Sequence, residues 1–444
     1  RAKSRALLDI VSGALDLEGS TGPNQNDPAE VKLETEMARL RAELNWRYSQ
    51  LTEVGKAAEA DNLGAACPDA ADWHRVIQER ERALEALQNR MAATQGVAGL
   101  YAPPIDLAAT QRLVPPNGAL IEYFLAGDQL TAFVLRGDSV HVFRDLVRAS
   151  ELVNLVRRVR FQIDRALVTG AEQASRVSRL LADARRELGS LDAAVLAPLR
   201  EAVGAAERLV IIPHGPLHAV PFHALWDGQQ YLIERAEVLY APSASLLAHM
   251  QREDDAGSFN GALVVGVPDE TAPQIAHETR QVAAALGTDN VLLGPSATVE
   301  RVTAAARGVS IVHLACHGRF SPTSPLMSGI KLADGWLTVR DNYKLRLSRA
   351  LVTLSACNTG RSVVGSGDEL VGLIRSFLAA GASSLVVSLW IVNDESAAAI
   401  MTDFYRAWQA GATPSAALRD AQRVMLDRRP HPAFWAPFIM EGSP

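Results

Sequence analysis

The second half of the chain alternates short apolar runs with longer segments of helical period. Few polar residues interrupt the apolar runs, which is typical of strands buried on both faces; they span residues 209–212, 262–267, 291–293, 310–315, 351–356 and 384–389. Most segments between them place apolar residues three or four positions apart, which predicts helices. Strands that alternate with helices predict an α/β fold, with a mostly parallel sheet covered by helices on both faces.

The first part of the chain has a purely helical pattern. Apolar residues at helical spacing predict helices over residues 1–17, 30–54 and 72–94. The second and third of these, joined by a loop, predict a helical hairpin of the kind that ends a repeat array, although no repeat of fixed period is visible. We therefore expect an α-helical N-terminal region.

A proline-rich stretch separates this region from the rest. Pro103, Pro104, Pro115 and Pro116 mark a boundary. Three β runs follow at residues 119–125, 130–135 and 139–144, which predicts an antiparallel meander, and residues 148–205 have helical period. We predict three parts: a helical region at 1–110, a meander with helices at 111–205, and an α/β domain at 206–444.

Composition narrows the class of protein. The 444 residues are 48% hydrophobic with a net charge of −6, so the chain can bury a large core but has no global basic surface for nucleic acid or anionic membranes. Its three cysteines, Cys67, Cys316 and Cys357, form no disulfide framework and predict a cytoplasmic protein. No apolar run is long enough to span a membrane. Because the chain lacks an initiator Met, we expect it to be part of a longer protein.

Two polar sites follow successive predicted strands. His317 and Gly318 follow the strand at 310–315, and Cys357 follows the strand at 351–356. Ligand sites of open α/β sheets lie at the carboxyl ends of strands, so we expect His317 and Cys357 to lie side by side. An imidazole can take the proton of a thiol, and nearby backbone N–H groups can stabilise an oxyanion. The alternative is that Cys357 is an inert buried cysteine.

Other motifs point away from metals and nucleotides. His214, His218 and His223 follow the strand at 209–212, but intervening prolines break any helix and no acidic or Cys ligand is near, so we expect no metal. Gly365-Ser366-Gly367 lacks the Lys of a phosphate-binding loop. We therefore expect no cofactor.

Several ordered segments resemble the CHAT family, caspase-like cysteine peptidases related to separase and often attached to tetratricopeptide repeats (TPRs). They are LVIIPHGPLHAVPFHAL (209–225), YLIERAEVLYAPSASLL (231–247), HLACHGRF (313–320), LVTLSACNTG (351–360), GDELVGLIRSFLAAGASSLVVSLWIVND (367–394) and FWAPFIMEG (434–442). The resemblance implies a caspase-like fold at 206–444, preceded by a pseudo-peptidase-like part at 111–205 and the end of a TPR array at 1–110.

The resemblance also implies roles for individual residues. His317 would be the general base, Cys357 the nucleophile, and the backbone N–H groups of Gly318 and Cys357 the oxyanion hole. Cys316 stands where the family often has Thr or Ser, and we expect it to pack in the core.

Substrate selection is implied by the segment at 389–394. In separase-like relatives an acidic residue there holds a basic P1 side chain, so Asp394 is the candidate, with Asp368 and Glu369 as further acidic residues. The alternative for all three is that they cap helices.

The sequence therefore predicts a cysteine endopeptidase that cleaves a specific partner protein through a His317/Cys357 dyad, regulated by its helical N-terminal region. By resemblance, it would act in bacterial cell death or phage defence, on a gasdermin-like or other effector protein, with an activating partner docked on the N-terminal helices. Two alternatives are a non-catalytic caspase-like scaffold and a nucleotide-binding enzyme, the latter without a glycine fingerprint.

Overall fold

The computed structural model describes residues 107–126, 128–169, 174–252, 260–270, 272–319, 328–342, 345–355 and 370–442, with seven single residues nearer the N-terminus: Glu36, Arg39, Glu43, Val76, Glu79, Arg80 and Ala83. The chain divides into two compact units, Ser12–Ala102 and Arg1–Val11 with Pro103–Pro444. The seven single residues belong to the first unit and are helical, within the helices predicted at 30–54 and 72–94. The helix predicted at 1–17 lies outside the described residues.

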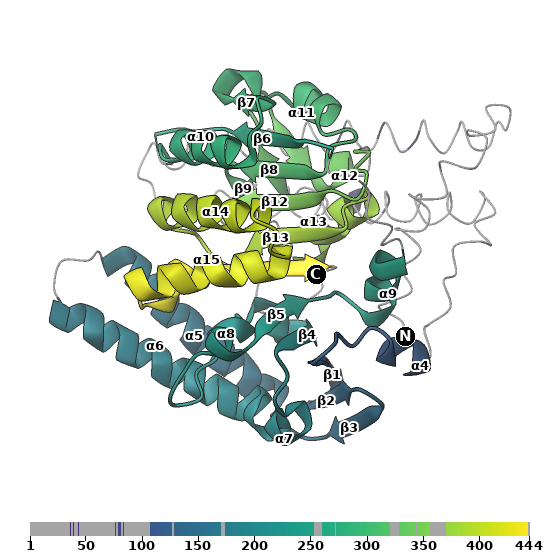
Figure 1. Ribbon diagram of the computed structural model, residues 1–444, viewed down its shortest axis with the longest axis vertical. Helices are drawn as coiled ribbons and strands as arrows, with labels where there is room; N and C mark the ends of the chain where they lie inside the picture. Colours follow the sequence, from purple (N-terminus) through teal and green to yellow (C-terminus); the bar gives the residue numbers. More distant parts are fainter. Residues whose placement is uncertain are drawn as a thin grey trace, which may run out of the picture. The chain divides into compact units, whose positions relative to one another are not determined.

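The described part of the larger unit is built on one sheet of eleven strands (Figure 1). Their order across the sheet is β3-β2-β1-β4-β5-β14-β13-β12-β8-β6-β7. The bounds are β1 Gly118–Ala126, β2 Gln129–Arg136, β3 Ser139–Phe143, β4 Arg208–Ile212, β5 Glu237–Tyr240, β6 Ala262–Gly266, β7 Val291–Leu293, β8 Ile311–Ala315, β12 Leu351–Ser355, β13 Ser384–Ser388 and β14 Phe438–Gly442.

Two parallel blocks and an antiparallel meander make up this sheet. Strands β1, β4, β5 and β14 are parallel neighbours, and so are β13, β12, β8, β6 and β7. β14 runs antiparallel to β13 and joins the blocks, while β1, β2 and β3 form the meander. The predicted α/β fold with a mostly parallel sheet is confirmed. The division at residue 205 stays a prediction, and the sheet continues across it.

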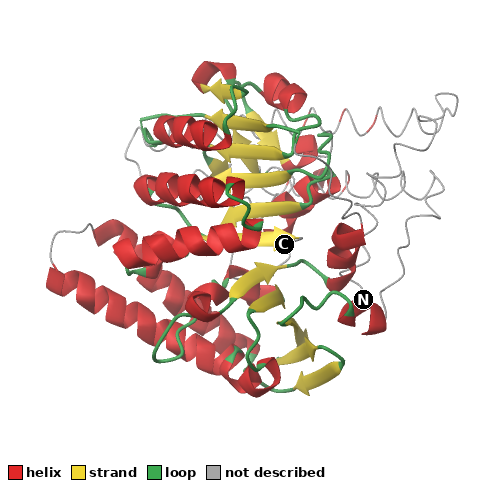
Figure 2. Cartoon of the chain, in the orientation of Figure 1, coloured by secondary structure: helices red, strands yellow, loops and turns green. Residues whose placement is uncertain are grey.

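Helices cover the sheet. α10, α14 and α15 lie side by side over one face, and the long helices α5 and α6 pack together near the meander (Figures 1 and 2). The helix bounds are α4 Leu107–Gln111, α5 Ala149–Thr169, α6 Ala174–Val195, α7 Arg200–Val203, α8 Leu232–Arg235, α9 Ala244–Arg252, α10 Ile275–Leu286, α11 Val299–Ala305, α12 Val339–Asn342, α13 Leu370–Ala379, α14 Asp394–Gln409, α15 Pro414–Arg428 and α16 Pro432–Trp435. Short 3₁₀ turns lie at Ala197–Leu199, Gly215–Ala219, Phe222–Ala224 and Gly294–Ser296.

Local sequence signals explain where several helices begin and end. Thr298 and Thr413 accept backbone N–H groups at the starts of α11 and α15, and Gly287 ends α10 in the left-handed conformation. Gly381 follows α13 with φ +100°, and a Cβ there would clash with the Leu347 carbonyl oxygen. These residues therefore set the ends of their helices.

The core lies along the central strands. Every residue of β6, β8, β12, β13 and β14 is buried, which explains their lack of polar alternation. The predicted strands are all present. The sequence pattern did not indicate β5 and β14 of the large sheet, nor the small sheet of β9 Gly318–Arg319, β10 Gly329–Lys331 and β11 Trp336–Thr338. Over the residues that the structure describes, no helix combines the length and hydropathy needed to cross a membrane.

Candidate active site

The strands β8 and β12 are parallel neighbours that end at paired residues. Ser355 at the end of β12 lies opposite Ala315 at the end of β8. His317 follows Ala315 by two positions, and Cys357 follows Ser355 by the same interval in the sequence. Cys357 lies outside the described residues, so its role stays a prediction.

The backbone around His317 is held by the small sheet. The His317 carbonyl accepts a hydrogen bond from Lys331 N at 2.8 Å, and Gly318 pairs with Ile330. These contacts fix the chain as it leaves β8, which holds the imidazole at the carboxyl edge of the large sheet. Gly318, predicted to contribute to an oxyanion hole, therefore lies in β9 directly after His317.

The imidazole of His317 contacts a carboxylate that sequence reasoning missed. His317 Nε2 lies 2.9 Å from Asp269 Oδ2, and the two side chains are 25% and 36% exposed. Asp269 follows β6, the neighbour of β8, and its Oδ1 accepts a hydrogen bond from Ala272 N. The sequence could have indicated Asp269 as a site residue, because it follows a buried parallel strand just as His317 does.

Asp394 lies beside the same imidazole. It is the first residue of α14, but the side chain that caps this helix is Asn393, which accepts from Ser396 N. The capping alternative is therefore wrong for Asp394. Its side chain lines a cavity of about 20 Å³ together with His317. Asp368 and Glu369, the other two candidates for P1 selection, lie outside the described residues.

The carboxyl group of Asp394 is in an unfavourable place for a negative charge. Burial raises its pKa most, the carboxylates of Glu278 and Asp269 raise it further, and His317 lowers it. This side of the site thus concentrates acidic groups around one imidazole, and a cation placed among them would be stabilised.

A buried polar chain runs beneath the site. Glu278 Oε1, on α10, lies 3.2 Å from Nε2 of His313. The other ring nitrogen of His313, Nδ1, lies 3.1 Å from the hydroxyl of Tyr405. That hydroxyl donates to Thr353 Oγ1 at 2.7 Å. The sequence offered only a weak signal here, because an isolated Glu on a helix and a His within a strand are usually structural.

Comparison with known proteins identifies the family. Residues 185–443, more than half of the chain, match the CHAT domain family. The chain belongs to the CHAT family. Tetratricopeptide repeat protein 28 of Homo sapiens and that of Mus musculus are each 28% identical over 302 residues, covering 54% of this chain and 12% of the relative. The chain therefore spans only a small part of the length of these curated relatives.

The fold of the CHAT domain also has a solved counterpart. A chain of the Saccharomyces cerevisiae separase–securin complex superposes with a TM-score of 0.54 at 10% sequence identity, covering 99% of this chain and 40% of that chain. At this identity the likeness concerns the fold, which is caspase-like. The predicted family and fold class are both confirmed.

Cys316, which directly precedes His317, is part of the core. Cys316 is 1% exposed, and burial raises the pKa of its thiol far above the usual value, with Glu278 adding to the effect. A thiol held in its protonated form is a poor nucleophile. Cys316 packs as expected from the sequence.

The three histidines after β4, His214, His218 and His223, do not gather at one site. His214 Nδ1 accepts from Leu125 N at 2.7 Å, His223 Nε2 donates to the Ala436 carbonyl at 3.2 Å, and His218 is buried. In the described ranges, no cluster of three or more His, Cys, Asp or Glu side chains is arranged to hold a metal ion.

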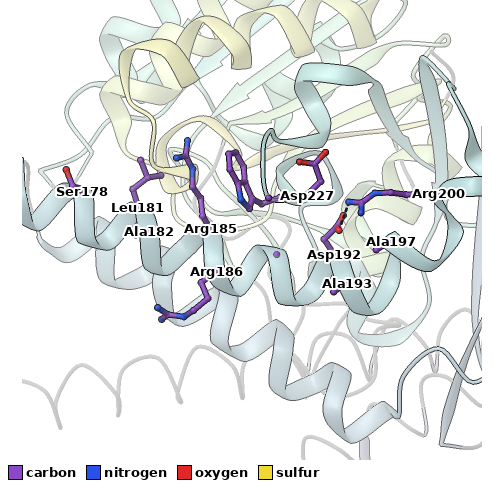
Figure 3. A pocket seen from close by; sticks show the side chains of 13 residues that line it. Ser178, Leu181, Ala182, Arg185, Arg186, Asp192, Ala193, Ala197, Arg200 and Asp227 are labelled. Atoms are coloured by element: carbon purple, nitrogen blue, oxygen red, sulfur yellow. Dashed lines mark hydrogen bonds and ion pairs between the residues drawn. The ribbon is translucent and has the colours of Figure 1, made fainter.

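A larger groove of about 790 Å³ runs along α6 and shares no lining residue with the cavity at His317 (Figure 3). Arg200 Nη2 contacts Asp192 Oδ2 at 2.6 Å, and the Arg185 guanidinium lies 4.3 Å from the centre of the Trp226 ring. Its lining contains no His or Cys. The first contact joins α7 to α6, the second joins α6 to Trp226, and we assign no reaction to this groove.

Proposed function

We propose that this CHAT protein is a cysteine endopeptidase that cleaves a peptide bond in a specific partner protein. The observation that carries the proposal is the parallel register of β8 and β12, from which His317 and Cys357 follow at the same interval. A caspase-like fold with a partly exposed His317 at the strand ends is consistent with this chemistry.

His317 takes the proton of the Cys357 thiol, and the thiolate attacks the peptide carbonyl carbon to form a C–S bond. Backbone N–H groups of Gly318 and Cys357 stabilise the oxyanion. His317 then returns the proton to the departing amine as the C–N bond breaks. Water, activated by His317, hydrolyses the thioester and restores the thiol.

Substrate selection and regulation belong to the same proposal. Asp394, together with Asp368 and Glu369, selects a basic P1 side chain, as the acidic surroundings of His317 favour. The N-terminal helices dock a regulatory partner, which agrees with relatives named for tetratricopeptide repeats. The cellular role proposed by resemblance is cleavage of an effector protein in bacterial cell death or phage defence.

A pair of cysteine variants tests the mechanism. With a mixed library of fluorogenic peptides, Cys357→Ala should lower hydrolysis by at least about 10³-fold, because the substitution removes the thiol that forms the thioester. Cys316→Ala is the matched control and should keep most of the activity, since Cys316 is buried. Both variants should keep the wild-type circular dichroism spectrum.

An electrophilic peptide separates the enzyme from a non-catalytic scaffold. Wild-type protein should be labelled at Cys357, and His317→Ala should abolish the labelling because the thiol loses its base. Wild-type cleavage by Cys357→Ala, or labelling that does not depend on His317, would refute the proposed mechanism.

A further inference from the structure

In the described part of the chain, the large sheet has two open edges that differ in length. One edge is β7, which has three residues and is followed directly by the 3₁₀ turn at Gly294–Ser296. The other is β3 at the outer end of the meander, whose only neighbour among the described strands is β2 (Figure 1). β3 has five residues, and the first four are exposed. Such an edge presents a row of backbone N–H and C=O groups to which another strand can pair.

The hairpin between β2 and β3 determines which backbone groups of β3 point outward. Arg136 and Ser139 face each other across a loop of two residues, the first of which, Gly137, has φ +54°, as such loops favour. The residues that close a two-residue loop form a hydrogen-bonded pair, and these pairs alternate with non-hydrogen-bonded ones. Val140 and Val142 therefore direct their backbone N–H and C=O groups away from β2.

The side chains of the same two valines form an apolar surface at this edge. Val140 is 37% and Val142 is 42% exposed, and both lie on the face of the meander that carries their β2 partners Leu135 and Phe133. The strand contains no proline, lysine, arginine or acidic residue, which are the usual means of keeping an edge strand unpaired. The edge is therefore suited to pairing with another apolar strand.

The charged residues beside β3 indicate which strand fits it. Asp138 precedes the strand and Arg144 follows it, each three residues from His141 at the centre, and both are exposed. When two copies of β3 pair antiparallel about His141, each Val140 lies opposite Val142 of the second copy. In the same register, each Arg144 lies beside Asp138 of the second copy. The strand is thus complementary to itself in both charge and apolar surface.

The neighbouring two-fold registers lack this match. A two-fold axis at Val140 would place Val142 opposite Asp138, and an axis at Val142 would place Val140 opposite Arg144. Each of these registers sets an apolar side chain against a charged one. The charges at the two ends of β3 therefore select the register centred on His141.

We propose that two copies of this chain associate through β3, antiparallel about a two-fold axis at His141, so that their sheets join into one. The backbone groups of Val140 and Val142 form the hydrogen bonds between the copies, and the four valine side chains pack on one face. An Arg144–Asp138 ion pair closes each end of the interface. This association is independent of the proposed peptidase function.

Sedimentation velocity of the full chain tests the association. Between about 1 and 100 µM, the wild type should change from monomer to dimer, because an interface of two short strands is small. Arg144→Asp and Asp138→Arg should each raise the dissociation constant at least about tenfold, since each places like charges together at both ends of the interface. The double variant Asp138→Arg/Arg144→Asp should return it to within about threefold of the wild type.

The control is Asp289→Arg, which reverses an exposed charge beside the other edge strand, β7, and should leave the dissociation constant unchanged. All these variants should keep the thermal midpoint of the wild type, because the substituted side chains are exposed. A wild type that stays monomeric at about 100 µM would overturn the proposal. A double variant that associates as weakly as the single variants would overturn it as well.

A disulfide tests the register directly. In the proposed dimer the two His141 residues form a non-hydrogen-bonded pair with Cα atoms about 4.5 Å apart, which is within the range of a disulfide. Under mild oxidation, His141→Cys should form a link between the two positions 141, identified by mass spectrometry. Ser139→Cys should form no such link, because position 139 lies opposite position 143 of the second copy. Linkage between the two positions 139, or none at 141 in a dimeric protein, would overturn the proposed register.

Discussion

Asp269 links two parts of the site through its two carboxylate oxygens. Oδ1 accepts from Ala272 N ahead of α10, and Oδ2 lies 2.9 Å from His317 Nε2. A carboxylate at Nε2 favours the tautomer with the proton on that nitrogen, which leaves Nδ1 as the basic nitrogen. Asp269 is therefore a positioning residue for the proposed general base.

Replacing this carboxylate tests the positioning role. Asp269→Asn should lower kcat by about 10- to 100-fold while KM changes less than twofold, because the amide no longer holds His317 in the reactive tautomer. Steady-state kinetics on a fluorogenic peptide measures both constants.

The neighbouring exposed Glu270 provides the control, since Glu270→Gln removes a charge from the same loop without touching His317. Asp269→Glu should recover part of the kcat, which loss of structure alone would not allow. A rise in KM with unchanged kcat would show instead that Asp269 acts in substrate binding.

The sequence pattern was enough to single out candidate site residues, but not the side chains that they contact. His317 was predicted because it follows a buried strand, and the structure places it two residues beyond the end of β8. The contact with Asp269 depends on the lateral order of β6 and β8 in the sheet, which strand sequences do not encode. Similarly, the helix start near Asp394 was visible, but which neighbour caps it depends on the backbone angles of Asn393.

At the level of elements, α5 holds the loop that leads from β13 to Asp394. Arg160 of α5 donates from Nη1 to the Leu389 carbonyl at 3.0 Å, and Trp390 Nε1 donates to the Ala433 carbonyl at 3.1 Å. The loop is therefore fixed from two sides by residues far away in the sequence. Arg160 precedes the predicted peptidase boundary at residue 206, so this part of the chain supports the candidate site.

Removing this contact should loosen the loop. Arg160→Ala should lower the free energy of unfolding by about 1 kcal/mol, through loss of a partly exposed charge-assisted hydrogen bond, and should lower kcat/KM about tenfold through displacement of Asp394. Urea denaturation and peptide hydrolysis measure the two effects.

Arg157→Ala is the control for helix propensity and charge, because Arg157 is exposed on the same helix. Equal activity of the two variants would show that α5 does not support the loop.

Fold prediction succeeded where a strand was buried and bounded by turn residues. β8 and β12 have five consecutive buried residues each, and their runs were recognised. β5 has only four residues, two of them partly exposed, and β14 includes the acidic Glu441. β14 joins the parallel blocks by pairing with β5 and β13, both distant in the sequence, so local pattern could not reveal its place.

Two buried histidines that do not line the candidate cavity, His223 and His431, are expected to make the stability of the protein depend on pH. Burial lowers the pKa of both His223 and His431 to about 4. His223 is enclosed between the Ala436 carbonyl and the Trp435 ring, and His431 caps α16 through Nδ1. Both imidazoles stay neutral in the folded protein over a range in which an unfolded chain is protonated.

The low pKa values of His223 and His431 make the folded protein less stable in acid. Between pH 6.5 and about 4 the unfolded chain binds protons at these histidines and the folded chain does not, so the free energy of unfolding falls as the pH falls. Each histidine can remove up to about 3 kcal/mol by pH 4. Asp192 and Asp394 act in the opposite direction, because burial raises the pKa of both carboxyl groups.

Urea denaturation at pH 7, 6, 5 and 4 measures the slope of the free energy of unfolding against pH. His223→Gln should flatten it, because glutamine does not titrate and its amide can still donate to the Ala436 carbonyl. His277→Gln, at an exposed position, should leave the slope unchanged. Wild-type unfolding free energies that agree at pH 7 and pH 5 would contradict neutral burial of these histidines, since the unfolded chain must take up their protons over that interval.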